Sequence, residues 1–296
     1  MQDAMRKADA LIEALPYIQR FKGKQFVVKF GGSAMEDQQV MDDVLEDVVF
    51  LATVGIRSIL VHGGGPHISR AMEQSGLQPQ FVGGHRVTDQ ATLEIVVRVL
   101  TQEVNARIIR RIEAWGGRGV PAFQGGRSLL RARKKLLTIQ GDNGRPQKVD
   151  VGFVGEVVSV DQQRLNDLTA GDGVLVVPPI GQDDSGQLYN VNADSAASAV
   201  ARDLTAEKIV FLSNVHGIMA RPGDPTSFLS SVDKAAVSDM IARGVISGGM
   251  LPKVAACLEA LEAGVHKAHI IDGTLKHSLL LEIFTDAGIG TEIVNR

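Results

Sequence analysis

The chain has 296 residues, of which 44% are hydrophobic, and its formal net charge is −3 at pH 7. This length and composition predict a full core in one large α/β domain or two smaller ones, and the slightly acidic balance argues against a nucleic-acid partner. No apolar run is long enough to span a bilayer, and the single cysteine, Cys257, excludes an internal disulfide, so we expect a cytoplasmic protein without a membrane partner.

The N-terminal segment has the pattern of an amphipathic helix. The apolar residues on its predicted face are Ala4, Met5, Ala8, Leu11, Ile12 and Leu15. Pro16 disfavours a helical conformation at the residue before it, so the helix is predicted to stop at Leu15. The apolar face packs either on the same subunit or on another copy of the chain, and the pattern leaves both alternatives open.

The first strand is predicted at residues 26–30 and carries Lys29 near its end. A Gly-Gly-Ser turn follows, and then a helix over residues 37–54. Glycines let a ligand approach bare backbone amides, Ser33 can cap the helix, and a helix start favours an anion. The alternative is an ordinary tight turn with a surface lysine. The segment is not a Walker A loop, because its lysine precedes the glycines.

A second strand, at residues 59–61, leads into a run of three glycines within residues 62–67. Three consecutive glycines cost backbone entropy, so we expect that a ligand or another backbone approaches closely there. Farther along, Arg86 lies in a loop before a helix that begins near residue 93 and that Thr88 or Asp89 can cap. The planar guanidinium suits a carboxylate ligand, and a surface salt bridge is the alternative.

Residues 116–150 are the least regular part of the chain, and we interpret them as a mobile hairpin with a turn at residues 141–144. A basic run within this part is interpreted as a solvated face: Arg127, Arg131, Arg133, Lys134 and Lys135. A strand at residues 149–160 and a helix at residues 161–168 come next.

Three polar residues stand two apart before an alanine-rich helix: Asn190, Asn192 and Asp194. Residues two apart in an extended chain point to the same side, so these side chains are expected to share one face. A simple helix cap by Asp194 would explain only one of the three.

The C-terminal third continues the alternation of strands and helices. Strands are predicted at residues 209–212 and 268–271, and a helix that contains Cys257 follows a Gly-Gly-Met-Leu-Pro-Lys segment. Together with the strand at residues 174–177, this order predicts a mainly parallel open sheet of the α/β class, in which ligands bind beyond the carboxyl ends of the strands. Each glycine-rich junction lies at such an end.

Five segments, in this order, resemble the amino-acid kinase family, and within it the kinases of N-acetyl-L-glutamate. They are Val-Val-Lys-Phe-Gly-Gly-Ser from Val27, Val-His-Gly-Gly-Gly-Pro from Val61, Gly-His-Arg-Val-Thr-Asp from Gly84, Asn-Val-Asn-Ala-Asp from Asn190 and Gly-Gly-Met-Leu-Pro-Lys-Val from Gly248. The resemblance implies a three-layer αβα sandwich. It also implies transfer of the ATP γ-phosphoryl group to the side-chain carboxylate of N-acetyl-L-glutamate, with Mg²⁺ carried by the nucleotide, as the second step of arginine synthesis.

The resemblance also implies roles for particular residues. Lys29 and Lys253 would stabilise the transferring phosphoryl group, and Asp194 would orient the two lysines. The substrate would bind at Gly64, Gly65, Arg86 and Asn190, and the nucleotide at Gly32, Ser213, Asn214, Gly217 and Gly249. The acceptor carboxylate is already ionised at neutral pH and needs no general base. No protein ligand for a metal is expected.

The implied division of the chain is an oligomerisation helix at residues 1–20, a lobe for the amino-acid substrate at residues 21–195 and a lobe for ATP at residues 196–296. The N-terminal helix and the C-terminal segment resemble the arginine-inhibited branch of the family, in which such helices interlace dimers into a hexamer, a trimer of dimers. L-Arginine would then bind beside Glu282, Gly288 and Gly290.

Two segments depart from the family pattern. Asn214 stands where an aspartate is usual and lacks its charge, and residues 124–127 replace the usual Gly-Lys-Asp. The rival interpretations are another family enzyme, of glutamate 5-kinase, aspartokinase or nucleotide monophosphate kinase type, and a regulator that binds arginine or nucleotide without turnover. A Rossmann dehydrogenase is disfavoured because the Gly-x-Gly-x-x-Gly fingerprint is missing. His266 and His269 are interpreted as structural.

Overall fold

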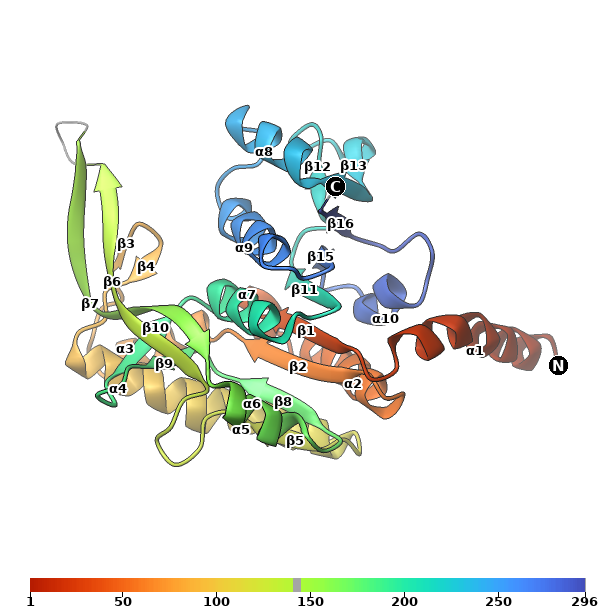
Figure 1. Ribbon diagram of the computed structural model, residues 1–296, viewed down its shortest axis with the longest axis horizontal. Helices are drawn as coiled ribbons and strands as arrows, with labels where there is room; N and C mark the ends of the chain where they lie inside the picture. Colours follow the sequence, from red (N-terminus) through yellow and green to blue (C-terminus); the bar gives the residue numbers. More distant parts are fainter. Residues whose placement is uncertain (141–144, 296) are drawn as a thin grey trace.

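The computed structural model describes residues 1–140 and 145–295, and the turn predicted at residues 141–144 lies outside them. The central sheet contains β1 (Gln25–Phe30), β2 (Arg57–His62), β5 (Gly119–Pro121), β8 (Val174–Val177), β11 (Lys208–Ser213), β14 (Ser231–Asp233), β15 (Lys267–Asp272) and β16 (Thr291–Val294). Their order is β14-β16-β15-β11-β1-β2-β8-β5 (Figure 1). Every neighbouring pair except β15 and β16 is parallel, so the predicted mainly parallel sheet is confirmed.

Helices cover both faces of this sheet, as the predicted three-layer αβα sandwich requires. One apolar layer includes α2 (Gln38–Thr53), α3 (Gly65–Gln74), α4 (Gln90–Arg98), α5 (Asn105–Ala114) and α10 (Ser278–Ile283). The other includes α6 (Gln162–Thr169), α7 (Ala193–Leu204), α8 (Lys234–Ala242) and α9 (Met250–Glu262). Cys257 of α9 is buried and unpaired.

Alternation along the strands decides which layer each side chain enters. In β1, Phe26 and Phe30 belong to the α2 layer, whereas Val27 belongs to the α7 layer. Lys29 is two residues after Val27 and therefore points toward α7. By the same rule Leu60 of β2 and, two residues later, His62 face the layer that contains α5.

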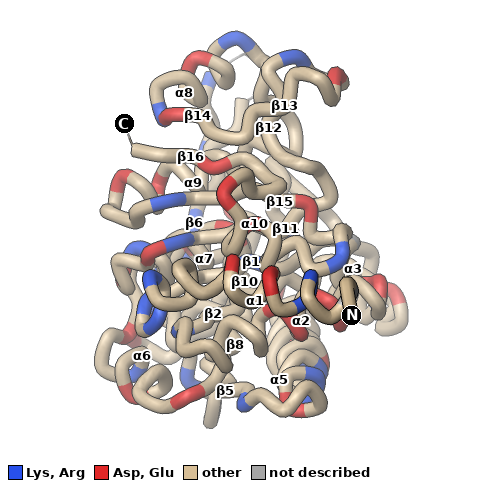
Figure 2. The backbone as a smooth tube through the Cα atoms, turned by 90° about the vertical axis from the view of Figure 1, so that its right-hand side faces the viewer, with Lys and Arg blue, Asp and Glu red and all other residues tan. Residues whose placement is uncertain are grey.

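A long hairpin extends from the body of the molecule on the side opposite the N-terminus (Figure 1). It consists of β6 (Leu130–Gln140) and β7 (Pro146–Val160), which close a small barrel with β9 (Ile180–Gln182) and β10 (Leu188–Val191). The antiparallel pairing of β6 with β7 confirms that the region forms a hairpin, although its second strand extends beyond the predicted end at residue 150. Its basic side chains pair with carboxylates of the neighbouring strand, Arg133 with Glu156 at 2.5 Å and Lys134 with Asp150 at 2.7 Å. Figure 2 shows basic and acidic residues interspersed along the chain.

Smaller elements complete the fold. Two-stranded pairs are formed by β3 (Phe81–Val82) with β4 (His85–Arg86) and by β12 (Ile218–Met219) with β13 (Phe228–Leu229). The short helical turns are η1 (Gly32–Met35) and η3 (Pro225–Ser227), and η2 (Val99–Val104) is a π-helix between α4 and α5. Among the described helices, none is long and apolar enough to cross a membrane.

The N-terminal helix α1 (Gln2–Phe21) projects from the molecule (Figure 1). The prediction that it stops at Leu15 is wrong, because the helix continues through Pro16. Proline removes one backbone donor, but tertiary packing compensates: Phe21 is buried in the core, and Tyr17 and Ile18 pack against it.

The apolar face of the first turns of α1 does not pack on its own subunit. Leu11 is 67% exposed and Ile12 is 68% exposed, and Met5 is also exposed. Of the two alternatives for this face, packing on the same chain is therefore excluded for these residues.

Candidate active site

Two lysines from different parts of the fold meet one carboxylate. Lys29 Nζ lies 2.8 Å from Asp194 Oδ1, and Lys253 Nζ lies 3.4 Å from Asp194 Oδ2. Lys29 comes from the end of β1, Asp194 from the first turn of α7, and Lys253 from the first turn of α9. The three residues that the sequence proposed as catalytic are therefore brought together at the carboxyl end of the parallel strands.

Asp194 is available for these contacts because it is not the helix cap. Asn192 caps α7, and its side-chain oxygen accepts hydrogen bonds from the amides of Asp194 and Ser195 at 2.9 and 3.0 Å. Asn192, and not Asp194, is therefore the N-cap of α7. The other caps are Asp37 for α2 and Asp89 for α4.

The charges in this cluster depend on one another. Burial lowers the pKa of Lys29, and the neighbouring Asp194 carboxylate opposes that shift. Burial alone would raise the pKa of Asp194, but the ammonium groups of Lys29 and Lys253 outweigh it and hold this pKa below its usual value. Asp194 is therefore ionised at neutral pH and stabilises both lysines electrostatically.

The two glycine-rich loops contact each other beside this cluster. The Gly63 amide donates a hydrogen bond to the Phe30 carbonyl at 2.7 Å. A Cβ atom at Gly63 would lie 3.2 Å from the Gly31 Cα, and one at Gly31 would lie 2.9 Å from Lys29 Nζ. The close backbone approach predicted for these loops is therefore found.

A cavity of about 260 Å³ opens next to the loops. Its lining includes Lys29, Gly32, Gly64, Gly65, Arg86, Asn190 and Asn192. The residues proposed for the substrate thus share one cavity with Lys29, and Asn190 and Asn192 face it together. Asp194 contacts the two lysines beside this cavity instead. The prediction that the three side chains share one face is therefore correct for the two asparagines.

Arg86 is the cationic side chain of this cavity, apart from Lys29. It is 6% exposed and donates to Ser69 Oγ at 2.8 Å and to the Gly65 carbonyl at 3.1 Å, and its guanidinium stacks on Phe81. In the described part of the chain it forms no ion pair with a carboxylate. A buried guanidinium without an acidic partner is suited to an anionic ligand.

The other residues proposed for the nucleotide lie outside the cavity that contains Arg86. Ser213 ends β11, Asn214 is exposed after it, and Gly249 precedes α9 with open space where a Cβ would be. Gly217 has a packing role of its own, because its φ is +144° and a Cβ would meet Phe228 at 2.9 Å. Apart from Gly32, none of these residues lines the cavity that contains Arg86.

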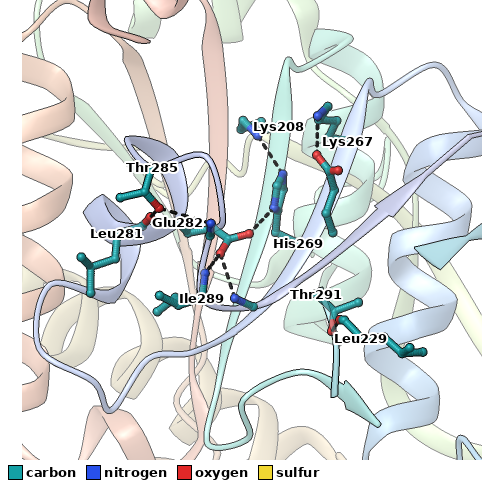
Figure 3. A network of polar contacts seen from close by, with 12 residues as sticks. Lys208, Leu229, Lys267, His269, Leu281, Glu282, Thr285, Ile289 and Thr291 are labelled. Atoms are coloured by element: carbon teal, nitrogen blue, oxygen red, sulfur yellow. Dashed lines mark hydrogen bonds and ion pairs between the residues drawn. The ribbon is translucent and has the colours of Figure 1, made fainter. Parts of the chain in front are cut away.

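A second cavity, also of about 260 Å³, lies between α1 and the C-terminal segment, and Glu282 and Gly288 line it. Glu282 accepts hydrogen bonds from His269 Nδ1 at 2.6 Å, from the Ile289 amide at 2.7 Å and from the Gly290 amide at 2.9 Å (Figure 3). Its carboxylate therefore holds the chain around Gly290 in place.

The neighbours of Glu282 extend this network. His269 also lies 2.9 Å from Lys208 Nζ, and burial lowers the pKa of Lys208 to about 8 (Figure 3). A Cβ at Gly288 would meet the Glu282 carboxylate at 2.8 Å. His266 contacts a different carboxylate, that of Glu207, so the two histidines have separate partners.

Sequence reasoning assigned no role to two buried residues beside the glycine loops. His62 is fully buried and Asn105 is 2% exposed, and their side chains are 3.1 Å apart. The glycine run directly after His62 was the feature of the sequence that could have drawn attention to this histidine. No sequence pattern pointed to Asn105. Over residues 1–140 and 145–295, no group of three His, Cys, Asp or Glu side chains could hold a metal ion.

Comparisons with known proteins agree with this geometry. The model of the amino acid kinase family matches residues 24–272. The acetylglutamate kinase of Heliobacterium modesticaldum is 44% identical over 294 residues, 99% of this chain and 100% of that protein. The acetylglutamate kinase of Geobacter sulfurreducens is 45% identical over 293 residues, 99% of each chain.

One solved structure extends the comparison. N-acetylglutamate synthase from Neisseria gonorrhoeae, complexed with coenzyme A and L-arginine, has a TM-score of 0.78 and 27% identity. The match covers 98% of this chain and 65% of that one, so this chain spans about two thirds of the synthase.

The fold and the site define a phosphotransferase, and the chain belongs to the amino acid kinase family. Within that family its similarity over nearly the full length is to acetylglutamate kinases, so the predicted group, an enzyme with a carboxyl group as acceptor, is confirmed.

Proposed function

We propose that the protein transfers the γ-phosphoryl group of ATP to the side-chain carboxylate of N-acetyl-L-glutamate, which gives N-acetyl-L-glutamyl 5-phosphate. The observation that carries this proposal is the Lys29–Asp194–Lys253 cluster beside a cavity with a buried, unpaired Arg86. Positive charge for a phosphoryl group and a separate cation for a carboxylate are what this reaction requires.

The proposed step needs no proton transfer. An oxygen of the acceptor carboxylate forms a bond to the γ-phosphorus while the bond to the β–γ bridging oxygen breaks, and ADP leaves with the electron pair. Lys29 and Lys253 neutralise charge on the transferring group, and Asp194 fixes both ammonium groups. The amides of Gly32 and Gly64 donate hydrogen bonds to the equatorial oxygens.

The substrate is proposed to bind in the cavity with its α-carboxylate on Arg86. The side chain of Asn190, which already contacts Thr88 Oγ1 at 3.2 Å, holds the acetamido end, and Gly64 and Gly65 allow the backbone to come close. The nucleotide is proposed to lie across Ser213, Asn214, Gly217 and Gly249. Mg²⁺, which prefers oxygen ligands and keeps several waters, binds the nucleotide phosphates.

Regulation and assembly belong to the same proposal. We place L-arginine in the cavity beside Glu282 and Gly288, with Gly290 behind them, and place the reaction in the cytoplasm as the second step of arginine synthesis. The exposed apolar face of α1 supports association through that helix into a hexamer, a trimer of dimers. Activity that stays flat across millimolar L-arginine would reject the regulatory part.

A single assay tests the proposed reaction against its rivals. The purified protein is incubated with ATP, Mg²⁺ and hydroxylamine, which traps acyl phosphates, and with N-acetyl-L-glutamate, L-glutamate or L-aspartate in parallel. We expect hydroxamate and equimolar ADP with N-acetyl-L-glutamate. Product with L-glutamate or L-aspartate alone would assign another family activity, and no product with any acid would leave a binding protein.

A further inference from the structure

A chain of three hydrogen bonds runs beneath the second glycine loop. His62 Nδ1 lies 2.7 Å from the carbonyl oxygen of Gly63, and His62 Nε2 lies 3.1 Å from Asn105 Nδ2. Asn105 Nδ2 also lies 3.2 Å from the carbonyl oxygen of Val176. The chain thus connects β2, α5 and β8 below the loop that ends at Gly64.

These contacts fix the protons of both side chains. The Val176 carbonyl only accepts hydrogen bonds, so the amide of Asn105 must turn its NH₂ group toward it and toward His62. His62 Nε2 must then accept, which leaves the proton on Nδ1, where it is donated to the Gly63 carbonyl. Complete burial lowers the pKa of His62 to about 4, so the imidazole stays neutral.

The position of the Gly63 carbonyl decides the direction of the next amide. In a planar trans peptide the C=O of one residue and the N–H of the next point to opposite sides. Because His62 holds the Gly63 carbonyl on the buried side, the Gly64 N–H points away from it. Gly64 lines the cavity that contains Lys29, and among the described residues this N–H has no backbone acceptor.

The π-helix η2 places the supporting side chains. It ends at Val104, directly before Asn105, and its extra residue per turn brings Leu100 against the loop, where a Cβ at Gly64 would lie 2.5 Å from Leu100 Cδ2. A π-helical turn is uncommon and is often found beside functional sites. Here it lets one helical stretch both pack on Gly64 and hydrogen-bond His62.

We infer that His62 and Asn105 are positioning residues for phosphoryl transfer, which together aim the Gly64 amide at the transferring group. The inference rests on the proposed phosphoryl transfer. His62 holds a defined tautomer and acts through the backbone rather than by taking a proton from the substrate. Asn105 selects that tautomer.

Four variants test the inference by kinetics. His62→Leu removes the donor to the Gly63 carbonyl, whereas His62→Asn keeps an N–H donor near the position of Nδ1. We expect His62→Leu to lower kcat about 100-fold, because a displacement of a catalytic group by about 1 Å can cost that much. We expect its KM for N-acetyl-L-glutamate to stay within about threefold of the wild-type value. We expect His62→Asn to recover at least about 10-fold of the loss, and Asn105→Leu to fall between them.

Ser58→Ala is the matched control. Ser58 is buried at the other end of β2, where its hydroxyl donates to the Ile56 carbonyl, so its loss affects the same strand at a distance from the loop. We expect its kcat to be unchanged, and thermal unfolding would report the stability of all four variants. Equal kcat values for His62→Leu and His62→Asn would overturn the inference. A loss of kcat in Ser58→Ala that matches its loss of stability would also overturn it, because kcat would then report the stability of the strand.

The tautomer can be observed directly in the wild-type protein, whatever its activity. Long-range ¹H–¹⁵N spectra identify the His62 ring by its absence in His62→Asn, and we expect a neutral ring with the proton on Nδ1 between pH 6 and pH 8. A ring protonated on Nε2, or on both nitrogens, would overturn the inference. Failure of the wild type to phosphorylate any acid would instead reject the proposed function, which separates the two failures.

Discussion

At the scale of single residues, Asp194 and its two lysines form a cluster with a net charge of +1. The cluster is largely buried, since Lys29 and Asp194 are each 6% exposed. In such surroundings an excess positive charge is costly unless an anion joins it. In the proposed reaction the γ-phosphate of ATP would supply that anion, so the charge of the cluster suits a nucleotide phosphate.

The lysines should therefore affect turnover more than folding. We expect Lys29→Met and Lys253→Met each to lower kcat about 100-fold to 1000-fold, because each removes a charge that is used when the phosphoryl group transfers. Steady-state kinetics with N-acetyl-L-glutamate, together with thermal unfolding, would measure both effects. Lys148 is exposed, so Lys148→Met is the control variant. Near wild-type turnover in Lys29→Met or Lys253→Met would show that the substituted lysine is not catalytic.

A second residue-scale prediction concerns Asp47 of α2, which accepts a hydrogen bond from His277 Nδ1 at 2.7 Å. Burial raises the pKa of Asp47 to about 6, although the bond from His277 opposes the shift. The folded chain therefore binds a proton at Asp47 between about pH 4 and pH 6 that the unfolded chain does not bind. Ionisation above pH 6 costs folding free energy.

Asp47→Asn should reveal this cost. The stability of the variant relative to the wild type should rise by about 3 kcal/mol from pH 4 to pH 6 and stay constant above, since two pKa units are worth about that much. Denaturant unfolding of both proteins across this range is the measurement. A difference that does not change with pH would contradict the assigned pKa.

At the scale of elements, the pattern of strands and helices predicted the sheet and the glycine junctions well, because alternation and turn residues are local signals. Two features escaped it. Pro16 lies inside α1 because Phe21 and its neighbours pack on the core, and η2 has no local sequence signature. The continuation of α1 depends on core residues far from it in the chain.

The site shows the same division. The lysines, Asp194 and Arg86 could be named because their motifs resemble a family and their chemistry is visible in their residue types. The hydrogen bond between His62 and Asn105 could not be predicted, because 43 positions separate the two residues and only the tertiary fold joins them.

The first turns of α1 carry an element-scale prediction. Leu11 and Ile12 are exposed in a single chain, so the double variant Leu11→Glu, Ile12→Glu should fold normally but lose the assembly that we propose for this helix. Light scattering after size-exclusion chromatography should show a smaller species, a dimer if the full assembly is a hexamer. Glu13→Gln on the same helix is the control, and an unchanged mass in the double variant would exclude α1 as the interface.

At the scale of the whole molecule, one sheet runs through both proposed lobes, and the lysine cluster lies where they meet. Lys29 of the cluster lines the cavity with Arg86, whereas Ser213, Asn214, Gly217 and Gly249, proposed for the nucleotide, lie outside it. Two ligands that bind to separate sets of residues should each stabilise the fold.

Thermal shifts would test this arrangement. Each ligand at 100 times its Kd should stabilise the wild type by about 2.7 kcal/mol. Arg86→Ala should lose the shift with N-acetyl-L-glutamate and keep the shift with a non-hydrolysable ATP analogue, and in kinetics it should mainly raise KM for N-acetyl-L-glutamate. Loss of the nucleotide shift alone would reverse the assignment of the two lobes.

The capping of α7 by Asn192 has a practical consequence. Because the neighbouring asparagine secures the beginning of this helix, position 194 can be altered without unwinding it. Asp194→Asn should thus keep the beginning of α7 while it removes the carboxylate that holds both lysines, so we expect an inert protein that is most stable with a nucleotide bound. Such a protein would let genuine ATP and its acceptor be crystallised side by side before they react.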